Sequence, residues 1–513
     1  MTVNQRHVAA AARGGGIVFG GKLFAWGARF VLAILLARLL GASDYGLYTV
    51  TLAVAAVVSA LAVFGMDAAM IRYVSIYMAR NDAARLRGTF QLGFAVPLAL
   101  ASLVGGGLVL LADFIAGSVM GEPRLAPLLR IGGLLVPAMV LNSILSAMLQ
   151  GLRRFGSSVL AEQFLQPTSR MVLLIGFAFV GMSPTLAMVA TLVSTVAVAI
   201  VMLYALRAHM QLGPGVERPT GEILRFTLPV YFSNIVQTFS GNLQTLLLGA
   251  LTTVAKAGVF AIANQIQLVG TLFHSAIVRS SMPLFAELHD TGERSKLEHL
   301  YQTTSKWTFS LNMPFFLVSI AFPEALMSLF GSDFTDGAAA LVILAWGAIV
   351  NAGTGTSGAM LDMTGHTVMK LINSSVSVAL AISLSLLLIP TFGVEGAAIA
   401  AVASVTAVNL LRVIEVARLE KVGPYNASYR KPLIAGAAAY AAAMLVAHGL
   451  AGGLAMVISA PLGIGALLVV YVGMLYVLGV DDDDRFVLGR AANRFRRRRG
   501  KPGTRAQHDP GRA

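Results

Sequence analysis

The chain has 513 residues, of which 57% are hydrophobic and only 12% are charged, and its mean hydropathy is +0.76. A soluble domain carries about twice that charged fraction, so the composition indicates an integral membrane protein. The absence of cysteine excludes disulfides, thiolate metal sites and cysteine nucleophiles. We interpret the net charge of +14 as loop arginines that set membrane topology rather than as a nucleic-acid surface.

Taken in chain order, the apolar stretches predict a polytopic all-α protein. A helix needs about 20 apolar residues to cross a bilayer, and fourteen stretches meet that requirement. The first follows Arg6 and Arg13 without a small-residue cleavage site, so we expect an uncleaved helix rather than a signal peptide. The predicted spans are 17–40, 45–68, 89–112, 127–150, 158–181, 184–206, 226–250, 257–280, 307–330, 338–361, 370–389, 394–417, 432–452 and 456–480.

The distribution of positive charge predicts the orientation of these helices. With the N-terminus inside, we assign 31 of the 38 Lys and Arg residues to the cytoplasmic side, four to the outside and three to the membrane interior. Cytoplasmic loops carry such an excess, so we expect both termini to be cytoplasmic. The chain is expected to be a multi-pass membrane protein.

The loops between spans are too short to hold a soluble domain. The charged stretch 281–306 predicts a short interfacial helix, and four aspartates at 481–484 suggest a solvated spacer. The arginine-rich segment behind them is consistent with contacts to anionic lipid or with a disordered topology anchor. The expected domains are an N-lobe at 1–206, a cytoplasmic linker at 207–225, a C-lobe at 226–417, two extra helices at 418–480 and a basic cytoplasmic tail at 481–513.

The two predicted lobes contain an internal repeat. LLGASDYGLYTVTLAV at 39–54 is echoed by LLGALTTVAKAGVFAIANQI at 247–266, and Gly46 and Gly258 are 212 residues apart. An even number of crossings separates the matched segments, which predicts two six-helix lobes in parallel topology. Two such lobes enclose a cavity near the bilayer midplane, the arrangement of alternating-access transporters. Two further echoes pair 147–155 with 359–367 and 72–90 with 279–304.

Three cations lie inside predicted spans, where a charge costs at least a few kcal/mol. Lys22 and Arg29 share one face of the first helix, at depths of about 8 and 18 Å, and Arg170 lies at about the depth of Arg29. We take Asp67 and Glu162 as the membrane-embedded carboxylates, and they suggest a Lys22–Asp67 pair and, less directly, an Arg170–Glu162 pair that could act in gating. Arg29 has no expected acidic partner. The arginines either form an anion-binding cavity or bind backbone carbonyls and reach to the interface.

The stretch 226–250 carries a stripe of uncharged polar residues at spacings of three and four. Asn234, Gln237 and Gln244 lie on this stripe, and amides suit sugar hydroxyls. Helix–helix hydrogen bonding is an equally valid explanation. The sequence has no catalytic constellation, no phosphate-binding loop and no pattern that predicts a metal or cofactor.

The segment ILLARLLGASDYGLYTVTLAV, followed by FGMDAAMIRYVSIYMARND, resembles the opening of bacterial polysaccharide-biosynthesis flippases of the Wzx type. MLQGLRRFGSSVLAEQ fits the turn between helices 4 and 5 in the same family, which belongs to the multidrug/oligosaccharidyl-lipid/polysaccharide (MOP) exporter superfamily. The resemblance implies two six-helix lobes around a central cavity, with two extra helices. It also implies transport of an undecaprenyl-diphosphate-linked oligosaccharide to the outer leaflet. Membrane lipids, a polysaccharide polymerase and chain-length proteins are the implied partners, and the bacterial cytoplasmic (inner) membrane is the implied location.

Other functions remain open from the sequence. A peptidoglycan-precursor flippase uses the same physical chemistry. A multidrug cation antiporter of the same superfamily needs a midplane carboxylate, and none is evident. A glycan polymerase or ligase needs a large outer loop with catalytic side chains, whereas the loops here are short. A scaffold for biosynthetic enzymes would leave the midplane arginines unexplained.

Overall fold

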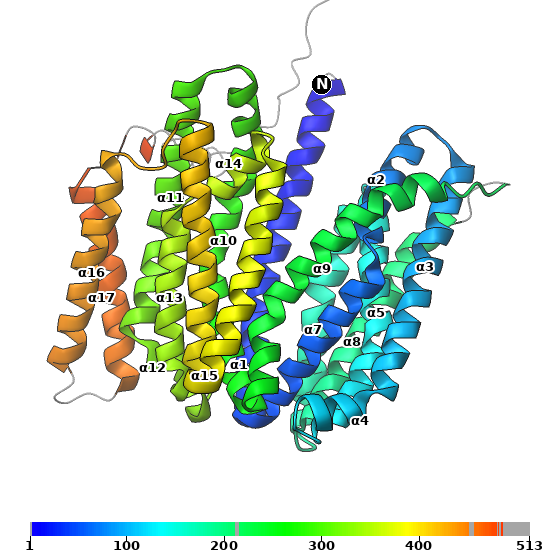
Figure 1. Cartoon of the computed structure of the whole chain (residues 1–513), viewed down its shortest axis with the longest axis horizontal. Coiled ribbons are helices and arrows are strands. Elements are labelled where there is room, and N and C mark those ends of the chain that lie inside the picture. The colour runs from blue at the N-terminus through cyan, green and yellow to red at the C-terminus, as the bar shows by residue number, and fades with distance from the viewer. Residues whose placement is uncertain (1–2, 211–214, 451–455, 480, 482–483, 486–513) are drawn as a thin grey trace, which may run out of the picture. The chain divides into compact units, whose positions relative to one another are not determined.

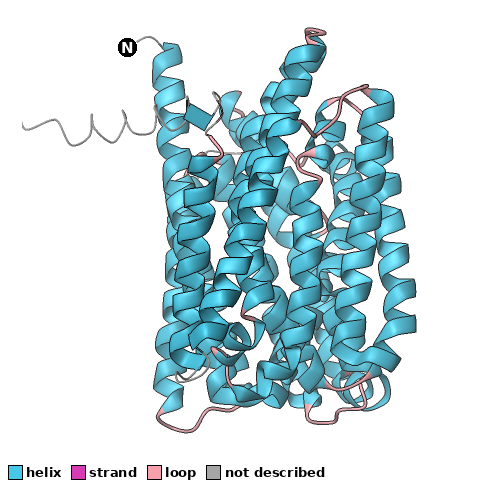
Figure 2. Cartoon of the chain, turned by 90° about the vertical axis from the view of Figure 1, so that its left-hand side faces the viewer, coloured by secondary structure: helices cyan, strands magenta, loops and turns pink. Residues whose placement is uncertain are grey.

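The computed structural model describes residues 3–210, 215–450, 456–479, 481 and 484–485, and this part of the chain is helical without any strand (Figures 1 and 2). In chain order, the elements are α1 (Val3–Val63), α2 (Met66–Ala79), α3 (Ala83–Leu110), α4 (Ala112–Phe114), the π-helix η1 (Ile115–Val119), α5 (Leu125–Gly151), α6 (Phe155–Val159), the π-helix η2 (Leu160–Leu165), α7 (Gln166–Ala178), α8 (Pro184–Met210), α9 (Thr220–Leu251), α10 (Val254–Asp290), α11 (Arg294–Ala321), α12 (Pro323–Ser328), the 3-10 helix η3 (Ser332–Gly337), α13 (Ala338–Gly353), α14 (Ser357–Met363), α15 (Thr367–Leu419), the 3-10 helix η4 (Ala427–Tyr429), α16 (Arg430–Leu450) and α17 (Met456–Val477).

Many of these helices have the length and composition of membrane spans. Within the described residues, eight are long and apolar enough to cross a bilayer, or up to nine if a bent pair within α10 forms one span. The apolar segments Leu23–Val63 and Val368–Leu419 have 41 and 52 residues, about twice what one crossing needs. The chain is therefore a multi-pass membrane protein of nearly all-helical structure. The fourteen crossings and their orientation stay predictions.

Both of these long helices are broken at a glycine. Gly41 has φ +70° inside α1, and Gly393 has φ +56° inside α15. Residues with a side chain rarely adopt positive φ, so a glycine allows the backbone to turn there at little cost. The breaks fall between the predicted spans 17–40 and 45–68, and between 370–389 and 394–417. The sequence therefore placed both boundaries correctly.

The exposed surfaces of the helices are apolar. Leu110 is 83% exposed, Leu445 75% and Val469 73%. Apolar side chains on this scale are unfavourable in water, so they indicate contact with lipid.

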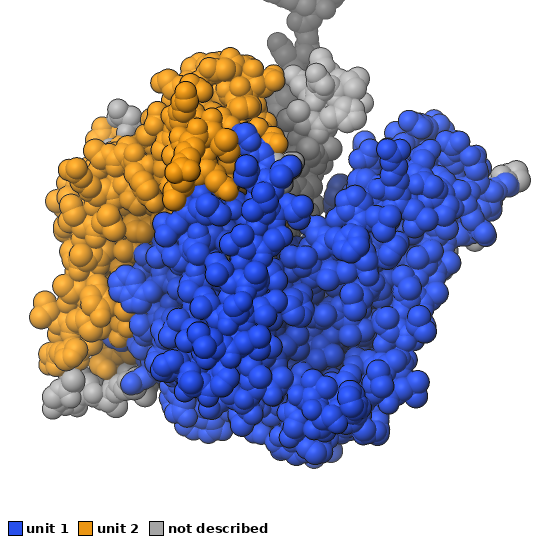
Figure 3. Space-filling model, viewed as in Figure 1, with its two compact units in different colours: residues 1–272, 322–351, 366–412 blue, residues 273–321, 352–365, 413–513 orange. Residues whose placement is uncertain are grey.

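The chain divides into two compact units, coloured separately in Figure 3. The first comprises residues 1–272, 322–351 and 366–412, and the second comprises residues 273–321, 352–365 and 413–513. In the first unit, α3, α5 and α8 pack side by side and α1 packs on α5 and α9. Its interior is filled by residues such as Leu129, Val140 and Met202, all of which are fully buried.

The first unit brings the glycines of the internal repeat into contact. A Cβ on Gly46 would lie 1.8 Å from the carbonyl oxygen of Val254, and a Cβ on Gly258 would lie 2.7 Å from that of Ala42. Ala42 and Val254 are 212 residues apart, as are the glycines. The two contacts are therefore reciprocal, as expected where related helices meet at a twofold axis. Small residues allow the helix backbones to approach this closely.

The second unit corrects the prediction of a separate interfacial helix at 281–306. Helix α10 continues to Asp290 and α11 begins at Arg294, with a turn between them. In that turn, Gly292 has φ +71°. The charged, amphipathic residues of 281–306 suggested a short helix of their own. In the structure they form the polar ends of the two long helices α10 and α11.

The second unit also corrects the prediction that the aspartate run is a solvated spacer. Lys306 on α11 is 6% exposed and binds Asp481 at 2.7 Å and Asp484 at 3.0 Å. Lys431 on α16 also pairs with Asp481, and the Trp307 indole donates to Asp484 at 2.6 Å. The aspartates thus compensate an otherwise buried charge. Asp482, Asp483 and the arginine-rich tail lie outside the described residues.

Candidate functional site

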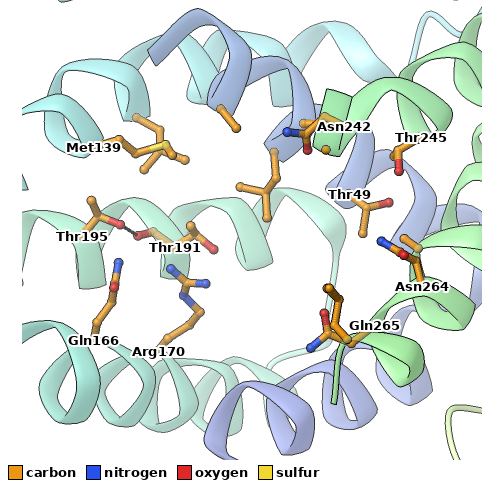
Figure 4. A pocket seen from close by; sticks show the side chains of 17 residues that line it. Thr49, Met139, Gln166, Arg170, Thr191, Thr195, Asn242, Thr245, Asn264 and Gln265 are labelled. Carbon is orange, nitrogen blue, oxygen red and sulfur yellow. Dashed lines mark hydrogen bonds between the residues drawn. The ribbon is translucent and has the colours of Figure 1, made fainter. Parts of the chain in front are cut away.

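The first unit contains a cavity of about 430 Å³, within the usual range of small-molecule sites. Segments of α1, α5, α7, α8, α9 and α10 surround it, so both halves of the repeat contribute (Figure 4). Its lining has one cation, several amides and hydroxyls, and no carboxylate. The lining residues are Thr49, Leu52, Ala53, Ala56, Leu135, Met139, Gln166, Arg170, Thr191, Thr195, Gly241, Asn242, Thr245, Ala261, Asn264, Gln265 and Leu268.

Arg170 supplies the charge of this cavity. It lies on α7, with its guanidinium beside Gln166 and Thr191 in Figure 4. Its Nε donates a long hydrogen bond of 3.4 Å to the Ser194 hydroxyl. Among the described residues it forms no ion pair, so most of its five donors remain available for an anion.

Arg29 and Glu162 adjoin this charge. Arg29 on α1 has an exposed side chain and interacts electrostatically with both Arg170 and Glu162. Glu162 lies on the π-helix η2, where its carboxylate accepts a hydrogen bond from Ser146. Arg29 therefore has an acidic neighbour, which corrects the expectation that it has none. The π turn changes the face on which this carboxylate lies, relative to a plain α-helix.

The local sequence explains this π turn. Pro167 follows η2 at the start of α7 and has no N–H to donate to the preceding turn. An interrupted helical ladder favours the wider π spacing, and π segments occur often at functional sites. A plain α-helical projection from the sequence could not include this rotation.

The proposed Lys22–Asp67 pair is not tested. The side chain of Lys22 lies outside the described residues. Asp67 at the start of α2 is half-buried, and its Oδ1 has no hydrogen-bond partner within the described part of the chain. Asp67 therefore remains a candidate for pairing or gating.

The amides predicted on α9 do not line the cavity. Asn234 is half-buried, Gln237 is exposed and Gln244 is buried. The cavity is instead lined on α9 by Gly241, Asn242 and Thr245. Asn234, Gln237 and Gln244 stay predicted substrate contacts for a wider path.

Other lining residues were not singled out as site residues from the sequence. Asn264 and Gln265 on α10 fit helix–helix packing as well as substrate contact, and Gln166, Thr191 and Thr195 belong to no recognisable motif. A signal was present nonetheless, because both amides on α10 lie within the repeated segment that contains Gly258.

Comparison with known proteins establishes the family. The model of the polysaccharide biosynthesis protein family matches residues 11–289, and the MatE model matches residues 229–387. The first match covers more than half of the chain. The chain therefore belongs to the polysaccharide biosynthesis protein family, as a Wzx-type member of the MOP superfamily, which confirms the resemblance seen in its sequence.

Two curated relatives carry names related to glycan export. The probable low-salt glycan biosynthesis flippase Agl15 of Haloferax volcanii is 25% identical over 33% of this chain and 36% of its own length. The succinoglycan biosynthesis transport protein ExoT of Rhizobium meliloti is 24% identical over 63% of each chain. The chain thus spans less than two thirds of the length of either relative.

Solved structures share the fold. The lipid II flippase MurJ in an inward closed conformation gives a TM-score of 0.68 at 13% identity, over 91% of this chain and 98% of that one. An inward-facing multidrug resistance MATE family transporter of the MOP superfamily gives 0.65 at 18% identity, over 77% of this chain and 95% of that one. At these identities, the likeness shows a MOP transporter fold and nothing of the substrate.

Proposed function

We propose that this protein flips an undecaprenyl-diphosphate-linked oligosaccharide from the cytoplasmic to the outer leaflet by alternating access. The fourteen crossings, the two six-helix lobes and the cytoplasmic termini belong to the same proposal. The product would enter O-antigen, exopolysaccharide or capsule synthesis. The curated relatives named as a glycan flippase and a succinoglycan transporter support this assignment.

The observation that carries the proposal is the chemistry of the cavity lining. Arg170 supplies a positive charge, whereas no carboxylate lines the cavity. A guanidinium binds phosphate oxygens through two parallel hydrogen bonds, and the low dielectric of a membrane-embedded site strengthens that attraction. A cation exporter would need the opposite charge in this position.

Arg29, and Lys22 on the same helix, would first attract the lipid diphosphate. Glu162 would hold Arg29 until the anion competes for it. The prenyl chain would stay in lipid between helices, and the glycan would lie along polar helix faces. Association with a polymerase and chain-length proteins is part of the proposal and would deliver the product to its next step.

Reconstitution into liposomes tests the proposal. Vesicles would contain a fluorescent prenyl-diphosphate oligosaccharide, and its accessibility to an impermeant quencher would be followed over time. We expect the wild-type protein to move the lipid between leaflets and not to transport a lipophilic cationic drug in parallel vesicles. Transport of the drug without movement of the lipid would overturn the proposal.

A further inference from the structure

The residues that line the cavity on α1 and α10 occupy equivalent positions of the internal repeat. Each residue on α1 has a counterpart 212 residues later on α10, and both members of each pair line the cavity. The pairs are Thr49 with Ala261, Leu52 with Asn264, Ala53 with Gln265 and Ala56 with Leu268. The backbones of α1 and α10 therefore lie at equivalent places around the cavity. Gly46 and Gly258, which precede these positions, are related in the same way.

The side chains break this symmetry. The α1 positions opposite Asn264 and Gln265 are Leu52 and Ala53, which are apolar. The cation, by contrast, comes from the first half, on α7. Figure 4 places Arg170, Gln166 and Thr191 at one side of the cavity, with Asn264 and Gln265 at the other.

The amides on the second-half side have unused hydrogen-bonding capacity. Asn264 and Gln265 are half-buried, and their side chains form no hydrogen bond within the described part of the chain. Neighbouring Asn242 donates one amide hydrogen to the carbonyl oxygen of Thr238 at 2.8 Å. An amide without a protein partner that borders a cavity is available to hydrogen-bond a polar ligand there. An amide both donates and accepts, as a sugar hydroxyl does, but it cannot neutralise a phosphate.

We propose that Asn264 and Gln265, with Asn242, form a sugar-binding subsite distinct from the anion-binding side of the cavity. The substrate then lies across the cavity, with its diphosphate at Arg170 and its first sugars at the amides. This assignment rests on the proposed function and adds an orientation to it. The first half of the repeat recognises charge, and the second half recognises hydroxyl groups.

Two ligands that differ only in their sugars test the subsite. Binding of farnesyl diphosphate and of farnesyl diphosphate carrying a disaccharide would be measured by calorimetry on protein in nanodiscs. The substitutions Asn264→Leu and Gln265→Ala give each position the residue of its repeat counterpart. Each should weaken the disaccharide ligand by about three- to tenfold, the usual worth of one hydrogen bond, and leave farnesyl diphosphate unchanged. Arg170→Gln should weaken both ligands.

Gln267→Leu is the matched control. Gln267 lies on the same helix but is buried outside the cavity lining, with its side chain donating to the carbonyl oxygen of Leu341 at 3.4 Å. It should leave the ratio of the two affinities unchanged. Retained binding of farnesyl diphosphate shows that a variant is folded, and Asn264→Ala and Gln265→Leu repeat the test with other side-chain shapes.

Equal weakening of both ligands, or of neither, in the amide variants would overturn the subsite while leaving the flippase assignment in place. If the wild-type protein binds neither ligand, the proposed function itself fails. If it binds both with equal affinity, the sugars make no contact and only the subsite is wrong.

Discussion

Arg29 and Arg170 stand in different surroundings although they share one region of the first unit. Arg170 lines the cavity and has a single long hydrogen bond to Ser194. Arg29 is exposed and has Glu162 as an electrostatic neighbour. A carboxylate near Arg29 offsets part of the repulsion between the two guanidinium groups. The same carboxylate would compete with an anionic substrate.

Removing the charge of Glu162 tests this competition. Glu162→Gln should tighten binding of a prenyl diphosphate by about two- to fivefold, because a partly exposed charge pair is worth up to about 1 kcal/mol. The flipping rate should fall, since release becomes harder. Calorimetry and the vesicle assay would measure the two effects. Weaker binding in this variant would show that Glu162 supports the arginines structurally.

The aspartates that follow α17 should make the stability of the fold depend on pH. Burial acts to raise the pKa of Asp481, but hydrogen bonds from Lys306 and Lys431 outweigh it and lower that pKa to about 2. The pKa of Asp481 in the folded protein lies below 3.8, the ordinary value for an aspartate, so the ion pairs stabilise the fold fully above about pH 4. This stabilisation is lost as the pH falls through about 2.

Asp481→Asn should therefore lower the melting temperature of the detergent-solubilised protein at pH 6. The difference from wild type should shrink as the pH falls from about 4 to about 2. Arg130→Gln provides a control, because Arg130 and Asp113 form an exposed pair at 2.7 Å that contributes little. A difference that stays constant down to pH 2 would rule out the ionised aspartate as its cause.

At the scale of helices, the two halves of the repeat approach each other closely at Gly46 and Gly258. There the second segment of α1, which begins after Gly41, crosses the start of α10. The cavity begins about one turn beyond this contact, at Thr49 and Ala261. The contact therefore closes one end of the cavity. In the proposed orientation, that end faces outward and must open when substrate leaves.

Gly46→Ala tests this role. The added Cβ would meet the Val254 carbonyl at 1.8 Å, so the two helices must move apart. In the cysteine-free chain, Thr49→Cys reports access to the cavity. An impermeant maleimide added outside should label it faster in the Gly46→Ala background. Gly176→Ala should have no effect, because a Cβ there meets nothing within 4 Å. Unchanged labelling with Gly46→Ala would show that this contact is no gate.

How far the sequence predicts these elements depends on the kind of signal. The glycine echo marked two segments as counterparts in the repeat, and the structure shows that these two segments meet. The polar spacing on α9 did not identify its cavity face. Residues three and four apart fit adjacent helical faces, and the packing of α9 on α1 determines which face meets the cavity. The π turn at Glu162 was likewise not predicted, although Pro167 gives a local signal for it.

At the scale of the whole molecule, charge distribution remains the basis of the predicted orientation. Arg124 illustrates the predicted outer side: it lies beside Glu122 and Asp44, in the loops that follow η1 and the Gly41 break. The turn between α10 and α11 belongs to the predicted cytoplasmic side. These two loops should therefore be reached from opposite sides of the membrane.

Single cysteines test the topology directly. Ser118→Cys and Thr291→Cys place a thiol at exposed positions on the predicted outer and cytoplasmic sides, and the chain has no other cysteine. In intact spheroplasts, an impermeant maleimide should label Ser118→Cys at once and Thr291→Cys only after permeabilisation. Labelling in the reverse order would invert the assigned direction of transport.

The most direct test of the account is the flipping rate of Arg170→Gln in proteoliposomes that contain a fluorescent prenyl-diphosphate oligosaccharide. The substitution removes the charge of the cavity and keeps a polar side chain. We predict a fall of at least about tenfold relative to wild type, as expected for the loss of a charge-assisted hydrogen bond worth about 1.5–3 kcal/mol. Arg130→Gln, outside the cavity, should flip at the wild-type rate. A wild-type rate in Arg170→Gln would contradict the claim that this cavity receives the anionic head of the lipid.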